Sequence, residues 1–160
     1  MIKANTSDLL RMKLIKFTLE QIGKEYVHGE HGPDSFDCAG FVWYVYNEVL
    51  GIDIYQEGFG NSTTTRIMTA PNGNMNYFLN DVKVGDILFF HTQSKNEYEP
   101  TEDNRYPGHC AIYLGDYELM HCTSMHKIFK VTKSNLLGKT KLSRKLQRMY
   151  VGSKNIIDYL

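Results

Sequence analysis

The first third of the chain has apolar residues at helical spacing in two separate stretches. The first stretch covers residues 7–22, where Ser7 can act as an N-cap and Gly23 can end the helix in a left-handed conformation. Its apolar face is formed by Leu10, Leu14, Ile15, Phe17, Leu19 and Ile22. This pattern predicts an amphipathic helix that packs against the rest of the protein.

The second stretch, residues 38–50, is more apolar than the first. Asp37 stands at the position of an N-cap, and Gly51 follows the last apolar residue as a stop signal. A helix that is apolar over most of its surface is usually buried. We therefore predict that this helix lies at the centre of the fold and that its N-terminus forms the floor of a cleft.

The pattern changes to strands after residue 84. Segments rich in β-branched and aromatic residues, separated by short turns, predict strands at residues 87–91, 109–114, 119–123, 128–131 and 149–152. Before them, a segment rich in Gly, Asn and Thr predicts long loops with one short helix near residues 64–69, and the polar residues 92–107 predict a flexible rim over a site. Helices first and a mostly antiparallel sheet of five to six strands afterwards indicate an α+β fold.

Composition adds only general limits to this picture. With 160 residues, of which 42% are hydrophobic and 22% charged, the chain is long enough for one sizeable core, and we expect a single domain over residues 1–160. The net charge of zero argues against a strong general attraction to nucleic acid. No apolar run approaches the length of a membrane span, and no signal peptide is visible, so we expect no membrane insertion.

The charges are unevenly distributed along the chain. Residues 119–157 contain no Asp or Glu, and all their charged side chains are Lys or Arg. We favour a solvated surface that the acidic residues of 97–103 balance. The alternative is a basic patch in this C-terminal quarter that contacts an anionic polymer of the bacterial wall.

Cys38 is the cysteine whose position suggests chemistry. It follows a Gly- and Pro-rich turn and opens the apolar helix, where unpaired N–H groups and the helix dipole favour a thiolate. The other two cysteines, Cys110 and Cys122, lie within apolar strand patterns and are expected to be core residues. The spacing of the three indicates neither a disulfide framework nor a paired metal knuckle.

Two histidines complete a possible catalytic group. His109 and His121 lie on the two strands of a predicted hairpin, with a separation that lets antiparallel neighbours face the same side of a sheet. A thiol, an imidazole that accepts its proton and a polar group that orients the imidazole form the general pattern of an activated nucleophile. We therefore predict that Cys38, His109 and His121 act together.

Three separated motifs carry a resemblance to a known family. Phe36-Asp37-Cys38-Ala39-Gly40-Phe41-Val42, Gly85-Asp86-Ile87-Leu88-Phe89-Phe90 and Gly108-His109-Cys110-Ala111-Ile112-Tyr113-Leu114-Gly115, followed by Met120-His121, resemble in order the motifs of the NlpC/P60 cysteine peptidases. The resemblance implies a papain-like fold and hydrolysis of the peptide part of bacterial peptidoglycan. It also implies that Cys38 is the nucleophile, His109 the base and His121 the orienting residue, with no cofactor and no metal.

The resemblance implies two further site residues. Tyr26 is similar to a family tyrosine that faces the nucleophile and helps to hold the oxyanion, although it could equally be a packing residue. Asp37 is a helix cap that could also touch the substrate. The family usually has Ser where this chain has Ala39, which lacks a hydroxyl that holds the free amine end of the substrate.

The sequence does not decide which bond of the substrate is cut. The family resemblance favours a D-glutamyl-diamino acid endopeptidase, but residues 32–38 also resemble the opening motif of phage-type N-acetylmuramoyl-L-alanine amidases of the same fold. More remote alternatives are an acyltransferase or thioesterase, a zinc site formed by Cys38, His109, His121 and Cys122, and an inactive wall-binding module. Action at the cell wall without a visible leader fits a phage lysin, an enzyme secreted with removal of its leader, or an injected toxin.

Overall fold

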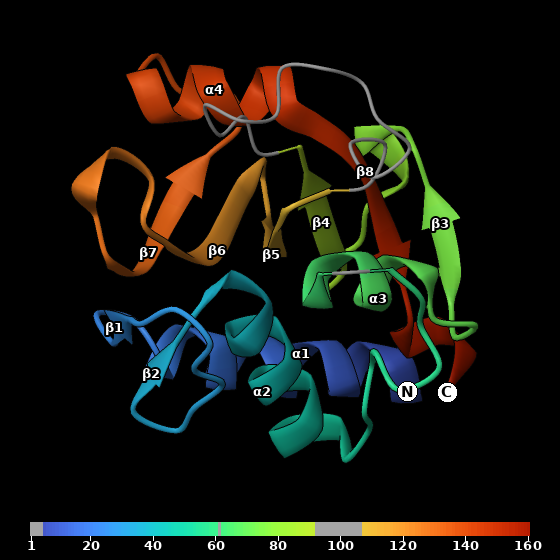
Figure 1. Cartoon of the computed structure of the whole chain (residues 1–160). Coiled ribbons are helices and arrows are strands. Elements are labelled where there is room, and N and C mark those ends of the chain that lie inside the picture. Colours follow the sequence, from blue (N-terminus) through green and yellow to red (C-terminus); the bar gives the residue numbers. More distant parts are fainter. Residues whose placement is uncertain (1–4, 61, 92–106) are drawn as a thin grey trace.

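The computed structural model describes residues 5–60, 62–91 and 107–160, and a single sheet runs through them. Its strand order is β2-β1-β7-β6-β5-β4-β8-β3, with β1 and β2 parallel and the other pairs antiparallel (Figure 1). The strands are β1 (Glu25–Tyr26), β2 (Ser35–Phe36), β3 (Asn74–Asn76), β4 (Ile87–Phe90), β5 (His109–Gly115), β6 (Glu118–Thr123), β7 (Lys130–Asn135) and β8 (Tyr150–Asn155).

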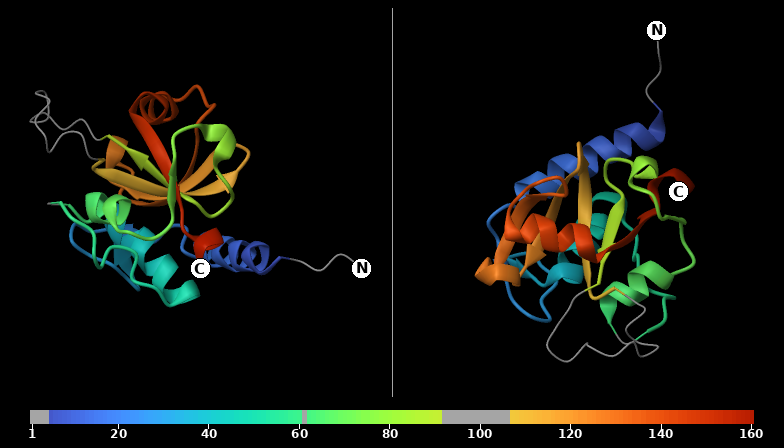
Figure 2. Two further views of the ribbon diagram at one scale, coloured as in Figure 1. Left: turned by 90° about the vertical axis from the view of Figure 1, so that its right-hand side faces the viewer. Right: turned by 90° about the horizontal axis from the view of Figure 1, so that it is seen from above.

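Helices cover both faces of this sheet. The helices α1 (Thr6–Glu20) and α2 (Cys38–Leu50) lie on one side, and α4 (Lys141–Met149) lies on the other (Figures 1 and 2). The short α3 (Thr63–Thr69) lies beside the N-terminal half of α2, and the 3-10 turns are η1 (Leu79–Asp81), η3 (Met125–Lys127) and η4 (Ile157–Tyr159). No helix of the described ranges is long and apolar enough to cross a membrane.

The strands alternate between two apolar clusters. Ile87 and Phe89 of β4 face the cluster on the side of α1 and α2, whereas Leu88 and Phe90 face the cluster under α4. Successive side chains of a strand point to opposite faces, so a strand buried on both sides is apolar throughout. The central strands are therefore held rigidly between two layers, which fixes the residues at their ends.

The α+β class is confirmed, but the expected number of strands was wrong. The sheet has eight strands rather than five to six, because β1, β2 and β3 were not predicted. These three strands are two to three residues long, too short for an alternating pattern to appear in the sequence. The strand expected at residues 128–131 lies instead at Lys130–Asn135.

The expectation that helices precede the sheet was also incomplete, because α4 follows seven of the eight strands. Its buried residues are Ser143, Leu146 and Met149, and its other positions are mostly charged or polar. The buried stripe of α4 is short, and the Lys and Arg residues around it obscure the helical periodicity in the sequence. The residues 92–106 that were expected to form a rim lie outside the described residues.

The capping signals predicted the two N-terminal helices with different success. Helix α2 has the predicted bounds, with Asp37 as its N-cap and Gly51 in a left-handed conformation with φ of 67° at its end. Helix α1 begins one residue earlier than expected, because Asn5 rather than Ser7 is its N-cap. Its buried positions are Arg11, Leu14 and Thr18, while Leu19 and Ile22, expected on the buried face, are exposed.

Candidate active site

Cys38 is the first residue of α2 and lies beside the start of β5. Its backbone N–H therefore has no partner within the helix and points out of the helix N-terminus. The side chain is partly exposed, whereas Cys110 and Cys122 are buried. The structure thus makes Cys38 the cysteine of the described chain that a ligand reaches most easily.

Two oxygen atoms lie close to the sulfur of Cys38. Its Sγ lies 3.6 Å from the carbonyl oxygen of Gly108 and 3.9 Å from Oγ1 of Thr64 on α3. The same Thr64 hydroxyl lies 3.9 Å from Sγ of Cys110. Cys110 is therefore buried as expected, but it also contacts the surroundings of Cys38 instead of only filling the core.

The surroundings favour the thiolate of Cys38. Hydrogen bonds from the Cys110 thiol and then from the His109 imidazole, together with the positive charge of His109, lower the pKa of Cys38 well below its ordinary value, although burial acts in the opposite direction. Burial raises the pKa of Cys122 to about 12 and that of Cys110 well above its ordinary value. Cys38 is the cysteine that ionises most readily.

His109 and His121 face each other across neighbouring strands. Nε2 of His109 lies 2.8 Å from Nδ1 of His121, and the two rings meet edge to face. The strands pair Ile112 with Met120, and this register, continued by one residue, places His121 opposite Ala111 and diagonal to His109. The hairpin thus brings the two imidazoles together as the sequence predicted.

His121 is the more deeply buried of the two, with no exposed surface, while His109 is 3% exposed. Burial, and then the charge of His109, lower the pKa of His121 well below its ordinary value. Nε2 of His121 lies 2.8 Å from Oγ of Ser134 on β7. His121 is therefore a neutral imidazole held between His109 and Ser134.

Tyr26 on β1 lies close enough to Cys38 to interact with its charge. Its pKa is raised by burial and next by the negative charge of Cys38, whereas the side chain of Ser124 acts in the opposite direction. The Tyr26 ring also packs against Phe129. Both expected possibilities, a residue near the nucleophile and a packing residue, are consistent with this position.

Asp37 organises the backbone immediately before Cys38. One carboxylate oxygen accepts a hydrogen bond of 2.7 Å from the N–H of Gly40, and the other accepts one of 3.1 Å from the N–H of Gly29. Burial raises the pKa of Asp37, and the two N–H donors act against this. Asp37 therefore caps α2 and ties the preceding loop to it, which positions Cys38.

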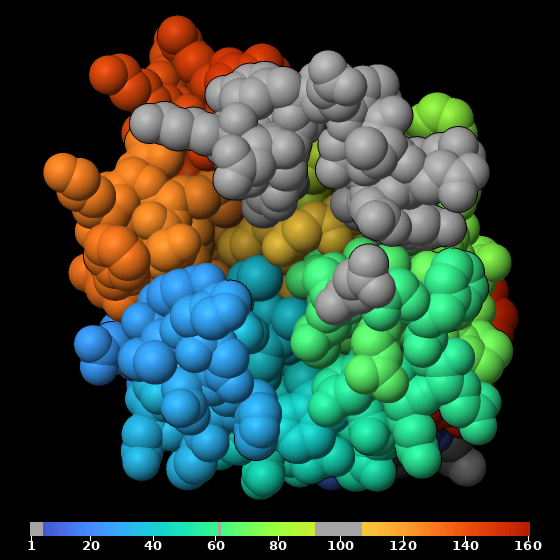
Figure 3. Space-filling view, viewed as in Figure 1, coloured from blue at the N-terminus to red at the C-terminus, as the bar shows by residue number. Residues whose placement is uncertain are grey.

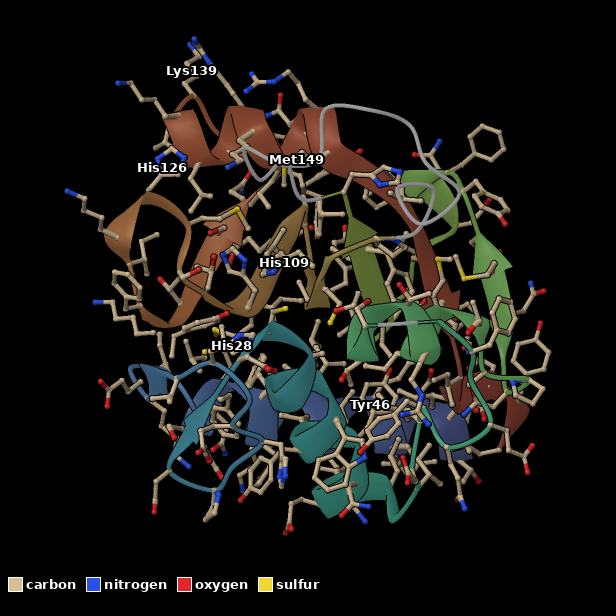
Figure 4. The ribbon with its side chains drawn as sticks, in the orientation of Figure 1. His28, Tyr46, His109, His126, Lys139 and Met149 are labelled. Carbon is tan, nitrogen blue, oxygen red and sulfur yellow. The ribbon has the colours of Figure 1, made fainter. Side chains whose placement is uncertain are left out.

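The space-filling view shows that this region is hollowed (Figure 3). The hollow lies between the blue and cyan segment before α2, the green α3 and the gold to orange strands β5 to β7. His109 lies beside β5 and β6 above the N-terminal end of α2, whereas His126 is at the outer edge of the molecule (Figure 4). The cleft expected at the N-terminus of α2 is thus present.

The described residues do not form the zinc site that was considered. No group of three or more His, Cys, Asp or Glu side chains among them is arranged to hold a metal ion. The facing nitrogens of His109 and His121 are directed at each other, and the thiol of Cys122 donates to the carbonyl oxygen of Phe36. These side chains therefore do not converge on one point.

Thr64, Cys110 and Ser134 are the contacting residues that the sequence did not single out. Each is joined to the site by a hydrogen bond or a close approach across different elements, namely α3, β5 and β7. Short polar side chains occur throughout the chain, so nothing local distinguishes them. A signal existed only for Cys110, which directly follows His109.

The comparison with known families identifies the class of this chain. The family model described as NlpC/P60 family matches residues 23–142, which include Cys38, His109 and His121. The chain therefore belongs to the NlpC/P60 family, as the motif resemblance indicated.

Individual relatives are more distant. The chain is 29% identical over 115 residues to "Probable endopeptidase YafL" of Escherichia coli, which covers 71% of this chain and 40% of YafL. It is 28% identical over 141 residues to "Murein DD-endopeptidase MepH" of Escherichia coli, which covers 87% of this chain and 43% of MepH. The chain thus spans less than half the length of these two relatives.

A solved structure supports the same fold. RipD from Mycobacterium tuberculosis, whose title describes a non-catalytic NlpC/p60 domain protein adapted to peptidoglycan binding, superposes with a TM-score of 0.62 at 14% identity. The match covers 92% of this chain and 97% of the RipD chain. At this identity the likeness concerns the fold alone.

Proposed function

We propose that this chain is a peptidoglycan hydrolase that cleaves an amide bond through a cysteine nucleophile. Cys38 is the nucleophile, His109 the general base and acid, and His121 the residue that orients His109. The observation that carries this proposal is the contact of 2.8 Å between the His109 and His121 rings beside a Cys38 whose pKa is lowered.

The mechanism follows from these positions. The Cys38 thiolate attacks the amide carbonyl carbon, and the backbone N–H of Cys38 together with the Tyr26 hydroxyl stabilises the oxyanion. The C–N bond breaks as His109 gives its proton to the leaving amine. Water, deprotonated by His109, then breaks the thioester and regenerates the thiol, and no metal ion takes part.

The names of the relatives support peptidoglycan as the substrate, since MepH is named a murein endopeptidase. Within that substrate we favour a bond of the wall peptide, the D-glutamyl-diamino acid bond. The second candidate is the N-acetylmuramoyl-L-alanine amide, favoured by the run Gly32-Pro33-Asp34-Ser35-Phe36-Asp37-Cys38. Ala39 is 3% exposed and offers no hydroxyl to the amine end of the substrate, so specificity must come from other residues.

RipD shows that an NlpC/P60 domain can be non-catalytic, and this alternative concerns the present chain directly. A chain that only binds the wall needs neither an ionised thiol nor paired imidazoles. Here the described residues include a thiol whose pKa is lowered and two facing imidazoles, and buried polar groups of this kind are costly unless they serve a purpose. Catalysis is therefore the better proposal.

The place of action and the contacts follow from the substrate. The enzyme acts at the bacterial cell wall, after delivery by a phage, by secretion or by injection. The exposed cations of α4 and its flanks, namely Lys139, Lys141, Arg144 and Arg148, could add contacts to anionic wall polymers. These contacts would weaken with rising salt concentration.

Digestion of purified peptidoglycan followed by mass analysis of the fragments tests this function. New amino termini identify a peptide bond that is cut, and free lactyl groups identify the amidase reaction. Cys38→Ala should release nothing, whereas the matched control Cys122→Ala, which alters a buried cysteine outside the reacting group, should release the same fragments as the wild type. Fragment release by Cys38→Ala would overturn the proposal.

Alkylation tests the nucleophile without any substrate. Iodoacetamide should label Cys38 before Cys110 or Cys122, because a lowered pKa gives Cys38 the largest thiolate fraction and only Cys38 is partly exposed. Peptide mapping at short reaction times measures the order of labelling. Earlier labelling of either strand cysteine would contradict the assignment.

A further inference from the structure

The second nitrogen of His121 has a partner that the proposed mechanism has not used. Nδ1 of His121 faces His109, while Nε2 lies 2.8 Å from Oγ of Ser134. Strand β7 pairs Thr132 with His121, and Ser134 is two residues further along, on the same face of the sheet. The contact is therefore fixed by the pairing of β6 with β7 and not by a mobile loop.

The proposed role of His109 as the general base fixes which nitrogens of His109 and His121 carry hydrogens. Before attack, His109 must accept the Cys38 proton on Nδ1, so its Nε2 carries a hydrogen that it donates to His121 Nδ1. After proton transfer His109 is an imidazolium and still donates from Nε2. In both states His121 must accept through Nδ1, and a neutral imidazole then carries its hydrogen on Nε2.

Only the neutral form of His121 satisfies this requirement. The ring has no exposed surface, and burial together with the charge of His109 lowers its pKa well below the ordinary value. Its Nε2–H therefore needs an acceptor, because a buried N–H without a partner is costly. Ser134 Oγ stands where that acceptor is needed.

Ser134 also faces a pocket on the other side from His121. It lines a pocket of about 500 Å³ between β7 and the segment before and at the start of α4, with Thr132, Gly138, Thr140 and Leu142 among the other lining residues. Neither histidine lines this pocket. The serine can therefore accept from His121 on one side and turn its own hydroxyl hydrogen toward the pocket on the other.

We propose that Ser134 is a positioning residue that fixes His121 in the tautomer required to orient His109. This inference rests on the proposed function, because it adds Ser134 to the group of residues proposed to act together. The hydrogen-bonded chain then runs from Cys38, His109 and His121 to a residue of β7. Without the acceptor, His121 is free to place its hydrogen on Nδ1, where it opposes the Nε2 hydrogen of His109.

The test compares Ser134→Ala with Ser134→Thr, which restores a hydroxyl, and with Thr132→Val as a matched control. Thr132→Val removes a hydroxyl from the same strand and the same pocket and keeps the side-chain volume. Thr132 pairs with His121 through the backbone, but the two ring nitrogens of His121 have His109 and Ser134 as their partners. Two-bond nitrogen–proton NMR spectra report the His121 tautomer, and the rate of Cys38 alkylation reports the thiolate. Turnover on peptidoglycan, separated into kcat and KM, reports the effect on catalysis.

In the wild type we expect His121 to carry its hydrogen on Nε2. Ser134→Ala should shift this tautomer, slow alkylation of Cys38 and lower kcat by about tenfold with little change in KM. Ser134→Thr should restore all three, and Thr132→Val should behave as the wild type. An unchanged tautomer and alkylation rate in folded Ser134→Ala, or equal losses in Thr132→Val, would overturn the proposal.

A second variant and a substrate-free measurement cover the cases in which Ser134→Ala does not fold or the wild type is inactive. If Ser134→Ala does not fold, Ser134→Cys keeps the volume but offers only a weak acceptor, so it should show the same shift in tautomer. If wild-type protein releases no fragments from peptidoglycan, the proposed function fails. The NMR and alkylation measurements still decide the role of Ser134 in that case, because neither needs a substrate.

Discussion

Two clusters of buried polar side chains in this protein are stabilised in different ways. The first, which we call the catalytic cluster after the function proposed for it, consists of Cys38, His109, His121 and Ser134 at the N-terminus of α2 and on β5 to β7. The anchor cluster consists of Arg11 on α1, Asp86 before β4, Asn155 on β8 and Asp158 in η4. Both bury groups that prefer water, so both need internal partners.

The anchor cluster uses permanent charges of opposite sign. The Arg11 guanidinium lies 2.8 Å from Asp86 and 3.1 Å from Asp158, and it donates to Asn155 at 3.0 Å. Burial acts to lower the pKa of Arg11, but the two carboxylates outweigh it and the pKa is raised. The cluster therefore ties α1 and the C-terminal segment to the sheet and holds no proton that is easily moved.

The catalytic cluster instead contains groups whose protons can move. The pKa values of Cys38 and His121 are both lowered. In the proposed mechanism, the charge of the cluster changes as His109 gains and loses its proton. The comparison teaches that burial alone does not make a polar cluster reactive. Reactivity also needs groups that can exchange a proton with one another and one partly exposed member, which here is Cys38.

Cys38→Ser should distinguish the roles of the two clusters most clearly, because it should affect turnover and leave stability unchanged. A serine hydroxyl is not ionised by an imidazole in this setting as a thiol is, so turnover should fall by roughly 10⁴-fold or more. The melting temperature should stay close to that of the wild type, because the side chain is partly exposed. Both are measured on the same preparation, and near-normal turnover would remove Cys38 from the mechanism.

The converse change is Arg11→Met in the anchor cluster. It leaves the Asp86 carboxylate, which has no exposed surface, without its cation, so the free energy of unfolding should fall by about 3–5 kcal/mol. Turnover per folded molecule should hardly change, because the cluster takes no part in the reaction. Urea unfolding and activity at a temperature where the variant is folded measure the two effects.

Lys83→Met is the control for this prediction. Lys83 also pairs with Asp158, at 2.6 Å, but its side chain is 58% exposed, so its loss should matter little. A loss as large as that of Arg11→Met would mean that burial is not what distinguishes the two cations.

A smaller effect is expected within the catalytic cluster from His121. His121→Ala should lower turnover by about 10 to 100-fold, whereas His121→Asn or His121→Gln should keep a substantial part, because an amide oxygen can accept from His109. His109→Ala should be far worse than any of them. Turnover and melting temperature measured together separate the roles, and an unchanged rate in folded His121→Ala would reduce the triad to Cys38 and His109.

The smallest effect is a pH dependence of stability. The pKa of His121 is lowered in the folded protein, so below about pH 6.5, the ordinary value, the unfolded chain takes up a proton that the folded chain does not. The contribution of His121 to stability is therefore complete above this pH and declines as the pH falls through it.

Urea unfolding of the wild type and of His121→Asn at pH 7.5 and pH 5.5 measures this effect. The wild type should lose more stability than the variant between the two values, and Asp86 and Asp158 contribute equally to both proteins. Equal losses in the two proteins would show that His121 does not resist protonation.

The sequence predicted those elements whose signals are local. The bounds of α2 follow from Asp37 and Gly51, and the strands β4, β5, β6 and β8 follow from apolar and β-branched runs, to within a few residues. The strands β1, β2 and β3 were missed because each is a short extended segment that exists only through its neighbour. Helix α4 was missed because its buried stripe is narrow.

The same division holds for the candidate site. The sequence by itself predicted the three residues to which we assign the chemistry, because a cysteine at a helix start and two histidines on a hairpin are recognisable from capping signals and strand spacing. Only the tertiary structure decided that Cys110 and Thr64 surround the thiol and that Ser134 completes the contacts of His121. These residues come from α3, β5 and β7, and their hydrogen bonds depend on distances set by sheet register and helix packing, which no local pattern records.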